Sequence, residues 1–295
     1  MRRILLFLDR IYMALAGLIL SPRNCRLVQF DLIRTWTRIR TIGRRNRTPT
    51  LDRMHLGSGG RKVPDWLNVD LGGADEICDV GQGRLPWKNE VFSAIVSQHM
   101  IEHLELDAQC IPLFKELHRV LKPQGQLWLS CPDIGKICSA YVDGKLDTIL
   151  ESRLTRWSTY SLEGKPISHL VNDMFHQWGQ HKNLFDFPLL QWALKQGGFD
   201  DVQHVREADL LKRFPKFPER NDDDQSIYVL ATKRAPEPGP EPVNKQDDPK
   251  TDTKADQKDN DKSDRLSKDG QAQTTNGRAD GPNNGPNQSE SQSSS

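Results

Sequence analysis

A glycine-rich stretch and two later acids are the residues whose types and spacing could hold a nucleoside. Gly57-Ser58-Gly59-Gly60 follows a short apolar run, and the missing side chains let the backbone approach a ligand closely. Asp70 ends a second apolar run, and Asp79 follows a third. An acid at the end of a strand in an α/β sheet can accept hydrogen bonds from ribose hydroxyls. The pattern therefore predicts a ligand site beside this loop.

A second group of residues could move a proton. His99, Glu102, His103 and the distant His181 are candidates for a general base. His99 to His103 also spell HxxEH, a zinc-peptidase motif, which requires a helix and a third, distant metal ligand. A plainer alternative is that Glu102 and His103 only brace a helix that we expect to begin near Asp107.

These residues need a parallel α/β unit to bring them together. The continuous apolar run 92–96 is typical of a strand buried on both faces. Ile111, Phe114, Leu117 and Leu121 recur at helical spacing, and Pro123 ends that helix. The run 127–129 follows and predicts the next strand. Strand, helix and strand in this order indicate an α/β fold.

The order HLGSGG, NVDL, CDV, FSAIVSQHMIEHL, ELHRVLKPQGQLWLSCPD resembles the class I methyltransferases that depend on S-adenosylmethionine (SAM). The chain is most similar to the type 11-like branch, over about residues 51–234. This resemblance implies a Rossmann-like, mostly parallel sheet of seven strands with an antiparallel closing pair, preceded by N-terminal helices.

The resemblance also assigns residues to the cofactor SAM. It implies that Gly57, Ser58 and Gly59 pass under the methionine end and that Asp70 holds the ribose. Asp79 would face the adenine amino group, with Leu71 and Val80 beside these acids. Residues 97–99, beginning with Ser97, would border the methyl group.

The chain departs from that family in two places. His55 stands where many members carry an acid before the glycine loop. Residues 58–66 are too few for a helical crossover, which needs about 10–12 residues, so we expect a loop in place of the first helix.

The segment around His99, Glu102 and His103 is also similar to a pattern in two methyltransferase families, which act on ubiquinone precursors and on small-RNA 2′-hydroxyls. In those families an ExxEH segment and a distant His hold a divalent ion, so the resemblance implies a metal site that includes His181. His99 replaces the first Glu of that pattern. A plain general base without metal is the alternative.

Residues 1–48 form a basic segment, since residues 1–50 contain eleven Arg against Asp9 and Asp31. Leu27, Phe30, Ile33 and Trp36 lie near helical spacing among the arginines. Residues 1–45 could therefore lie on an anionic membrane surface, or they could pack as helices on the catalytic domain. The apolar stretch of 17 residues from Ile4 to Leu20 is short for a membrane span and is interrupted by Asp9 and Arg10. The interleaved apolar residues argue against nucleic-acid binding.

Five scattered cysteines without CxxC spacing predict reduced thiols and a cytoplasmic protein, peripheral on the inner membrane face if residues 1–45 bind lipid. Residues 134–186 predict one short helix and an irregular insertion whose aromatic residues either cover the substrate or form a local core. Residues 187–194 predict a helix, and 202–205 and 227–231 predict the last strands. Residues 235–295 lack aromatic side chains and predict a disordered polar tail.

Two functions are compatible with these features. The first is SAM-dependent methyl transfer to a small-molecule, sugar-linked or lipid-linked acceptor, with a hydroxyl as the expected target. The alternative is a non-catalytic SAM-binding or scaffolding module at the membrane surface.

Overall fold

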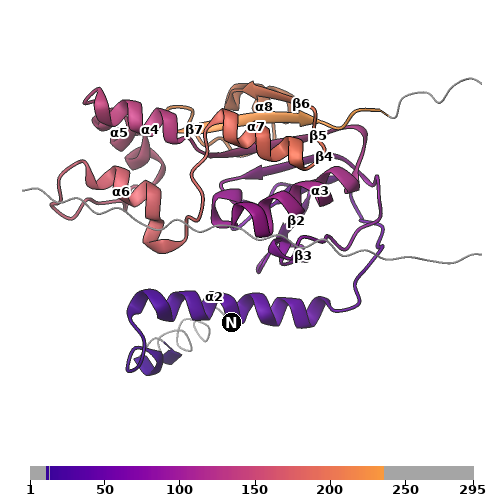
Figure 1. Ribbon diagram of the computed structural model, residues 1–295, viewed down its shortest axis with the longest axis horizontal. Coiled ribbons are helices and arrows are strands. Elements are labelled where there is room, and N and C mark those ends of the chain that lie inside the picture. Colours follow the sequence, from indigo (N-terminus) through magenta and orange to yellow (C-terminus); the bar gives the residue numbers. More distant parts are fainter. Residues whose placement is uncertain (1–10, 13, 236–295) are drawn as a thin grey trace, which may run out of the picture. The chain divides into compact units, whose positions relative to one another are not determined.

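A seven-stranded sheet forms the centre of the protein in the computed structural model, which describes residues 11–12 and 14–235. The strand order is β3-β2-β1-β4-β5-β7-β6 (Figure 1). The strands are β1 (Arg53–Leu56), β2 (Leu67–Asp70), β3 (Glu76–Ile77), β4 (Phe92–Gln98), β5 (Leu121–Pro132), β6 (Asp201–Val205) and β7 (Ser226–Thr232). β1 to β5 pair in parallel, and β7 runs antiparallel to both of its neighbours. The expected Rossmann-like, mostly parallel sheet is confirmed.

The sheet is buried on both faces, as the apolar run in β4 predicts. Ile95 packs with helices α3 (Ile111–Val120) and α7 (Phe187–Gln196) in one hydrophobic cluster. Its neighbour Val96 packs on the opposite face with α8 (Glu207–Arg213). Successive side chains of a strand point to opposite faces, so one short apolar segment contributes to both layers (Figure 1).

The connection from β1 to β2 contains no helix, as its length predicts. Gly57 and Ser58 instead begin a loop that stays close to β2, since the N–H groups of both residues donate to the carbonyl of Val69 on β2. The chain returns from β3 to the other side of β1, since β1 pairs with both β2 and β4. The carboxyl ends of β1 and β4 therefore meet where the strand order reverses, which is the usual ligand site of such sheets.

Residues 134–186 are more regular than expected, and the prediction of an irregular insertion is wrong. They form α4 (Ile134–Val142), α5 (Leu146–Arg156) and α6 (His169–His176), followed by the short helix η4 (Gln177–Gly179). Buried residues of these helices make a separate hydrophobic cluster with Tyr160 and Phe175 at its edge. Helix α4 confirms the expected short helix, and the local core answers to the second of the two expectations for the aromatic residues, whereas α5 and α6 have no clear apolar period in the sequence.

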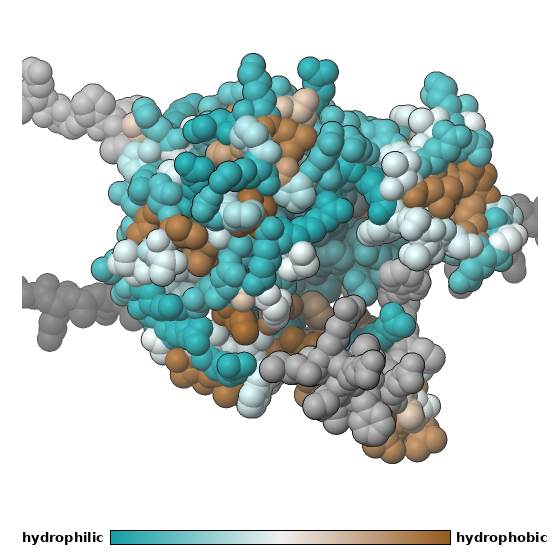
Figure 2. All heavy atoms as spheres, turned by 180° about the vertical axis from the view of Figure 1, so that it is seen from behind, coloured by the Kyte–Doolittle hydropathy of each residue, from teal (hydrophilic) through white to brown (hydrophobic). Residues whose placement is uncertain are grey.

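The N-terminal segment contains helix α2 (Pro22–Thr41), capped by Ser21. Thr37 of α2 is buried and donates a hydrogen bond to the carbonyl of Leu71, after β2. Most of its large apolar side chains remain exposed, including Phe30, Trp36 and Ile39. Figure 2 shows hydrophobic side chains along the lower side of the molecule, where α2 lies in Figure 1.

Some predictions fall outside the described residues. The tail that the sequence predicts to be disordered lies at 236–295 apart from its first residue, and much of the N-terminal apolar run lies at 1–10. Among the described residues, no helix is long and apolar enough to cross a membrane. The five cysteines are unpaired. The domain boundaries near residues 48 and 235 stay predictions.

Candidate functional site

A cavity of about 300 Å³ opens at the carboxyl ends of β1 and β4. One side is formed by the glycine loop after β1 and the turn after β4, and the other by α5, α6 and the loop before β7. Figure 2 shows a recess with hydrophilic walls between the sheet and the α4–α6 helices. The cavity therefore lies where the strand order predicts a ligand site.

The glycine loop lines this cavity through Gly57, Ser58, Gly59 and Gly60. Gly57 has a positive φ of 71°, and a Cβ there would lie 2.6 Å from the side chain of Met100, so this position requires glycine. The buried Ser58 hydroxyl has no hydrogen-bond partner among the described residues. The backbone of Gly59 is held by Asp70, whose Oδ2 accepts from Gly59 N–H at 2.8 Å. The loop is thus an ordered cradle with a free hydroxyl.

The remaining residues assigned to SAM do not line the cavity. Asp70 also accepts from Leu71 N–H, and Asp79 accepts from Gly81 N–H. Asp79 is ion-paired with two arginines of α2, Arg34 at 3.2 Å and Arg38 at 2.7 Å. Both oxygens of Asp79 are therefore engaged, and α2 packs beside the acids expected to hold adenosine. Val80 starts the short helix η1 (Val80–Gln82), and Ser97 is buried in β4. The roles of these five residues stay predictions.

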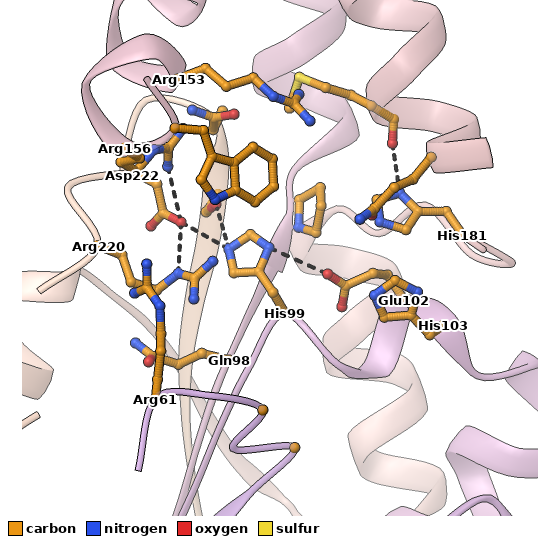
Figure 3. A pocket seen from close by; sticks show the side chains of 18 of the residues that line it. Arg61, Gln98, His99, Glu102, His103, Arg153, Arg156, His181, Arg220 and Asp222 are labelled. Atoms are coloured by element: carbon orange, nitrogen blue, oxygen red, sulfur yellow. Dashed lines mark hydrogen bonds and ion pairs between the residues drawn. The ribbon is translucent and has the colours of Figure 1, made fainter. Parts of the chain in front are cut away.

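His99 lies at the centre of a charged network (Figure 3). One ring nitrogen lies 2.9 Å from Asp222 Oδ2, and the other lies 3.3 Å from Glu102 Oε1. Burial lowers the pKa of His99, but its hydrogen bonds to the two carboxylates outweigh that effect and raise the pKa above 6.5. Each ring nitrogen faces a carboxylate oxygen, an arrangement that favours the protonated imidazole, with both N–H groups as donors and no free lone pair. The φ of His99, 53°, is unusual for a residue other than glycine, a kind of strain that clusters at functional sites.

Glu102, His103 and His181 form a separate cluster in which one ligand atom of each lies within 4.8 Å of the others. His103 Nδ1 lies 3.3 Å from the Gln180 carbonyl, and His181 Nδ1 lies 2.6 Å from the Met174 carbonyl. These contacts favour the tautomers in which each Nε2 keeps its lone pair. Glu102 Oε2 is buried and unpaired among the described residues. Burial lowers the pKa of His181 below 6.5, so this imidazole is neutral at neutral pH.

The structure brings together some of the site residues that the sequence predicts and separates others. Glu102, His103 and His181 converge as the metal pattern implies, whereas His99 turns to Asp222. The zinc-peptidase motif is not formed, because His99 and His103 do not converge and only Ile101–His103 is helical, as the 3₁₀ turn η2.

No sequence pattern predicts the arginines that line the cavity or their partner Asp222. Four arginines line the cavity: Arg61, Arg153, Arg156 and Arg220. Asp222 is fully buried and accepts from Tyr228, His99 and Arg220, with Arg156 at 3.2 Å. No motif marks these residues, and three of the arginines are distant in sequence from the glycine loop. Only their tertiary convergence identifies them.

Comparisons with known proteins agree with this architecture. Residues 71–129 match the family model described as "Methyltransferase domain". No curated protein matches the chain in sequence.

Solved structures similar to the chain include three methyltransferases. One is a SAM-dependent methyltransferase from Thermotoga maritima, described as a possible histamine N-methyltransferase (14% identity, 63% of this chain and 83% of that chain, TM-score 0.37). Another is a SAM-dependent methyltransferase from Mesorhizobium loti (20% identity, 63% and 92%, TM-score 0.35). A third is phosphoethanolamine N-methyltransferase 2 of Haemonchus contortus (15% identity, 54% and 37%, TM-score 0.29).

Proposed function

We propose that this chain, of which residues 71–129 match a methyltransferase-domain model, is a class I, SAM-dependent methyltransferase that methylates a hydroxyl of a small-molecule, sugar-linked or lipid-linked acceptor. The observation that supports this proposal most directly is the shared cavity. The glycine loop after β1 and the His/Glu residues after β4 open into the same space, at the point where the strand order reverses.

The residues present fit SAM at this point. The glycine loop offers close backbone approach, and Ser58 supplies a buried hydroxyl without a partner. His55 also lines the cavity, and its buried Nδ1 has no partner among the described residues. SAM, when bound, supplies a methyl group on a positively charged sulfur. The chain's own contribution is to hold the acceptor in line with that group and to remove the hydroxyl proton.

His181 suits proton removal better than His99. His181 is neutral and keeps one ring nitrogen free, whereas both nitrogens of cationic His99 are directed at carboxylates. We therefore assign His181 as the proton acceptor and His99 as a positioning residue, which holds Glu102 and Asp222 in place.

As an alternative to a plain base, the cluster of Glu102, His103 and His181 fits a divalent metal ion, since the free nitrogen of His181 can either accept a proton or coordinate an ion. One potential ligand atom of each residue lies within 4.8 Å of the others, and Glu102 Oε2 is buried without a partner among the described residues. Backbone carbonyls orient both rings, which is the usual outer-shell arrangement at metal sites. Two nitrogens and one oxygen suit zinc, manganese or iron better than magnesium. A bound ion would lower the pKa of an acceptor hydroxyl.

The alternative is a non-catalytic SAM-binding or scaffolding module, and one observation supports its placement at a membrane surface. Helix α2 contacts Leu71 and Asp79 beside the expected adenosine site while its apolar side chains face outward. We propose that this face rests on an anionic membrane, in either function. SAM binding without turnover on any acceptor would support the alternative.

The cofactor assignment can be tested by titration calorimetry with SAM. Asp70→Ala should weaken SAM binding about tenfold or more, because Asp70 orders Gly59 in the loop and is the predicted ribose acceptor. Asp65→Ala is a matched control, since Asp65 is an exposed acid paired with Lys216 away from the cavity. The proposed function fails if wild-type protein does not bind SAM. Equal affinity in wild type and Asp70→Ala removes Asp70 from the site.

A further inference from the structure

The walls of the cavity carry more positive than negative charge. Four arginines line it against two carboxylates, Glu102 and Asp222. These two carboxylates are fewer than the four guanidinium groups, and Asp222 also accepts hydrogen bonds from His99 and Tyr228. Such a concentration of one charge in a partly buried site is costly unless a ligand of opposite charge fills it.

Arg156 and Arg220 are held in place by one shared anchor. Arg156 comes from the last turn of α5 and Arg220 from the loop before β7, and both reach Asp222 Oδ2, at 3.2 and 3.1 Å. Each side chain is only 15% exposed. A guanidinium has five N–H donors in a fixed fork, and each contact to Asp222 joins a single nitrogen. Asp222 therefore orients two arginines while leaving most of their donors available.

Arg61 completes this group from the opposite wall. It follows the glycine loop, and its side chain makes no hydrogen bond or ion pair with a described residue. Burial lowers the pKa of Arg61, and the positive charge of Arg220 lowers it further. Arg153 also lines the cavity, but it is ion-paired with Asp173 at 3.6 Å and lies over the rings of Trp157 and Tyr160, so the proposed site does not include it. Figure 3 shows Arg156 and Arg220 to the left of His99, with Arg61 below them.

We propose that the methyl acceptor is an anion, whose phosphate or carboxylate group binds between Arg61, Arg156 and Arg220. Arginine forks match the oxygens of such groups in bidentate hydrogen bonds. The indole of Trp157, 48% exposed at the cavity, provides an apolar surface for the rest of the acceptor.

This inference rests on the proposed function, since it names the substrate class of the same site. SAM carries a net positive charge, so a neutral acceptor would leave the loaded cavity more cationic still. The negative charge of an anionic acceptor would offset the positive charges of both the arginines and the sulfonium. The carboxylate of SAM is a second anion that can bind Arg61, so the experiment must distinguish it from the anionic group of the acceptor.

The test uses pyrophosphate as the anionic probe and S-adenosylhomocysteine, the demethylated form of SAM, as the cofactor probe. Calorimetry measures pyrophosphate binding to full-length protein saturated with S-adenosylhomocysteine, with and without chelator to remove any contribution of bound metal. Arg61→Gln and Arg156→Gln should each weaken pyrophosphate binding about tenfold, because each removes charge-assisted hydrogen bonds. Arg213→Gln on α8, outside the cavity, is the matched control and should bind as wild type does.

The Arg61→Gln variant should fold as wild type does, because the substitution removes no ion pair between described residues. Pyrophosphate binding that is absent in wild type, or unchanged in both cavity variants, overturns the anion site. Loss of S-adenosylhomocysteine affinity in Arg61→Gln with unchanged pyrophosphate affinity in both variants assigns Arg61 to the cofactor and also overturns it. Pyrophosphate binding to a wild-type protein that never binds either cofactor form would overturn the proposed methyl transfer and leave the anion site standing.

Discussion

Asp222 shows how one buried carboxylate can set the electrostatics of a whole site. Burial alone would raise its pKa, but hydrogen bonding to His99 and the charges of His99 and Arg220 hold the pKa well below its usual range. Asp222 therefore stays ionised and keeps His99 protonated in return. Because both belong to one network, removal of Asp222 would leave several buried donors unpaired, which costs more than the loss of one contact.

The burial of His55 should make the stability of the protein depend on pH. His55 is 2% exposed, and burial lowers its pKa to about 4, so the unfolded chain takes up a proton first as the pH falls. Stability from this residue is thus present above pH 6.5 and is lost as the pH falls towards 4. The change is on the order of 3 kcal/mol.

Urea unfolding at pH 7 and pH 4.5 measures this loss. His55→Phe, which keeps an aromatic ring against Phe217, should lose less stability on acidification than wild type. His118 and His181 have lowered pKa values in both proteins, so the difference isolates His55. An identical pH dependence in the two proteins would contradict a buried, neutral His55.

At the scale of elements, α2 has two faces with different roles. Thr37, Arg34 and Arg38 contact the core beside the acids after β2 and β3. Leu32, Trp36 and Ile39 are exposed. A helix with apolar residues exposed among arginines binds anionic lipid surfaces through burial of those side chains and through charge. One face of α2 therefore contacts the expected cofactor site, and the other exposes apolar side chains that could meet a membrane.

The vesicle test exchanges only exposed residues of α2. Wild-type protein should sediment with vesicles that contain anionic lipid at low salt, and less so as salt screens the arginines. Trp36→Ser combined with Ile39→Ser should reduce the bound fraction several-fold, whereas Trp192→Ser, an exposed tryptophan of α7, should not. If wild-type protein stays in the supernatant at low salt, α2 is not a lipid-binding helix.

In the whole molecule, the proposed metal site depends on tertiary structure. Glu102 and His103 follow β4, whereas His181 comes from the segment after α6. The unfolded chain does not hold these ligands together, so an ion that binds them stabilises the folded state. At zinc about 100-fold above its dissociation constant, stabilisation of about 2.7 kcal/mol corresponds to a rise in Tm of about 5–10 °C.

Thermal unfolding of full-length protein with and without zinc checks this expectation. His181→Ala should abolish the rise in Tm, whereas His118→Ala, on α3 outside the cluster, should retain it. The metal proposal is wrong if zinc leaves the Tm of wild-type protein unchanged and elemental analysis finds no bound metal.

Sequence patterns alone were sufficient for the elements whose signals are local. The buried strand β4, the amphipathic helix α3 and the helix-free loop after β1 follow from apolar periodicity, proline and glycine positions and segment length. These signals report burial and backbone conformation within a few residues, so they do not depend on where distant segments lie. The glycine cradle was identified in the same way.

The composition of the cavity was decided by tertiary structure. Arg156, Arg220 and Asp222 have no periodic pattern, and each acquires its role from a neighbour far away in the chain. His99 resembled a catalytic base in the sequence, but the approach of Asp222 from the loop before β7 makes it a cation. A charge or protonation state depends on what surrounds a group in three dimensions, and local sequence contains no information about neighbours that only long-range packing brings close.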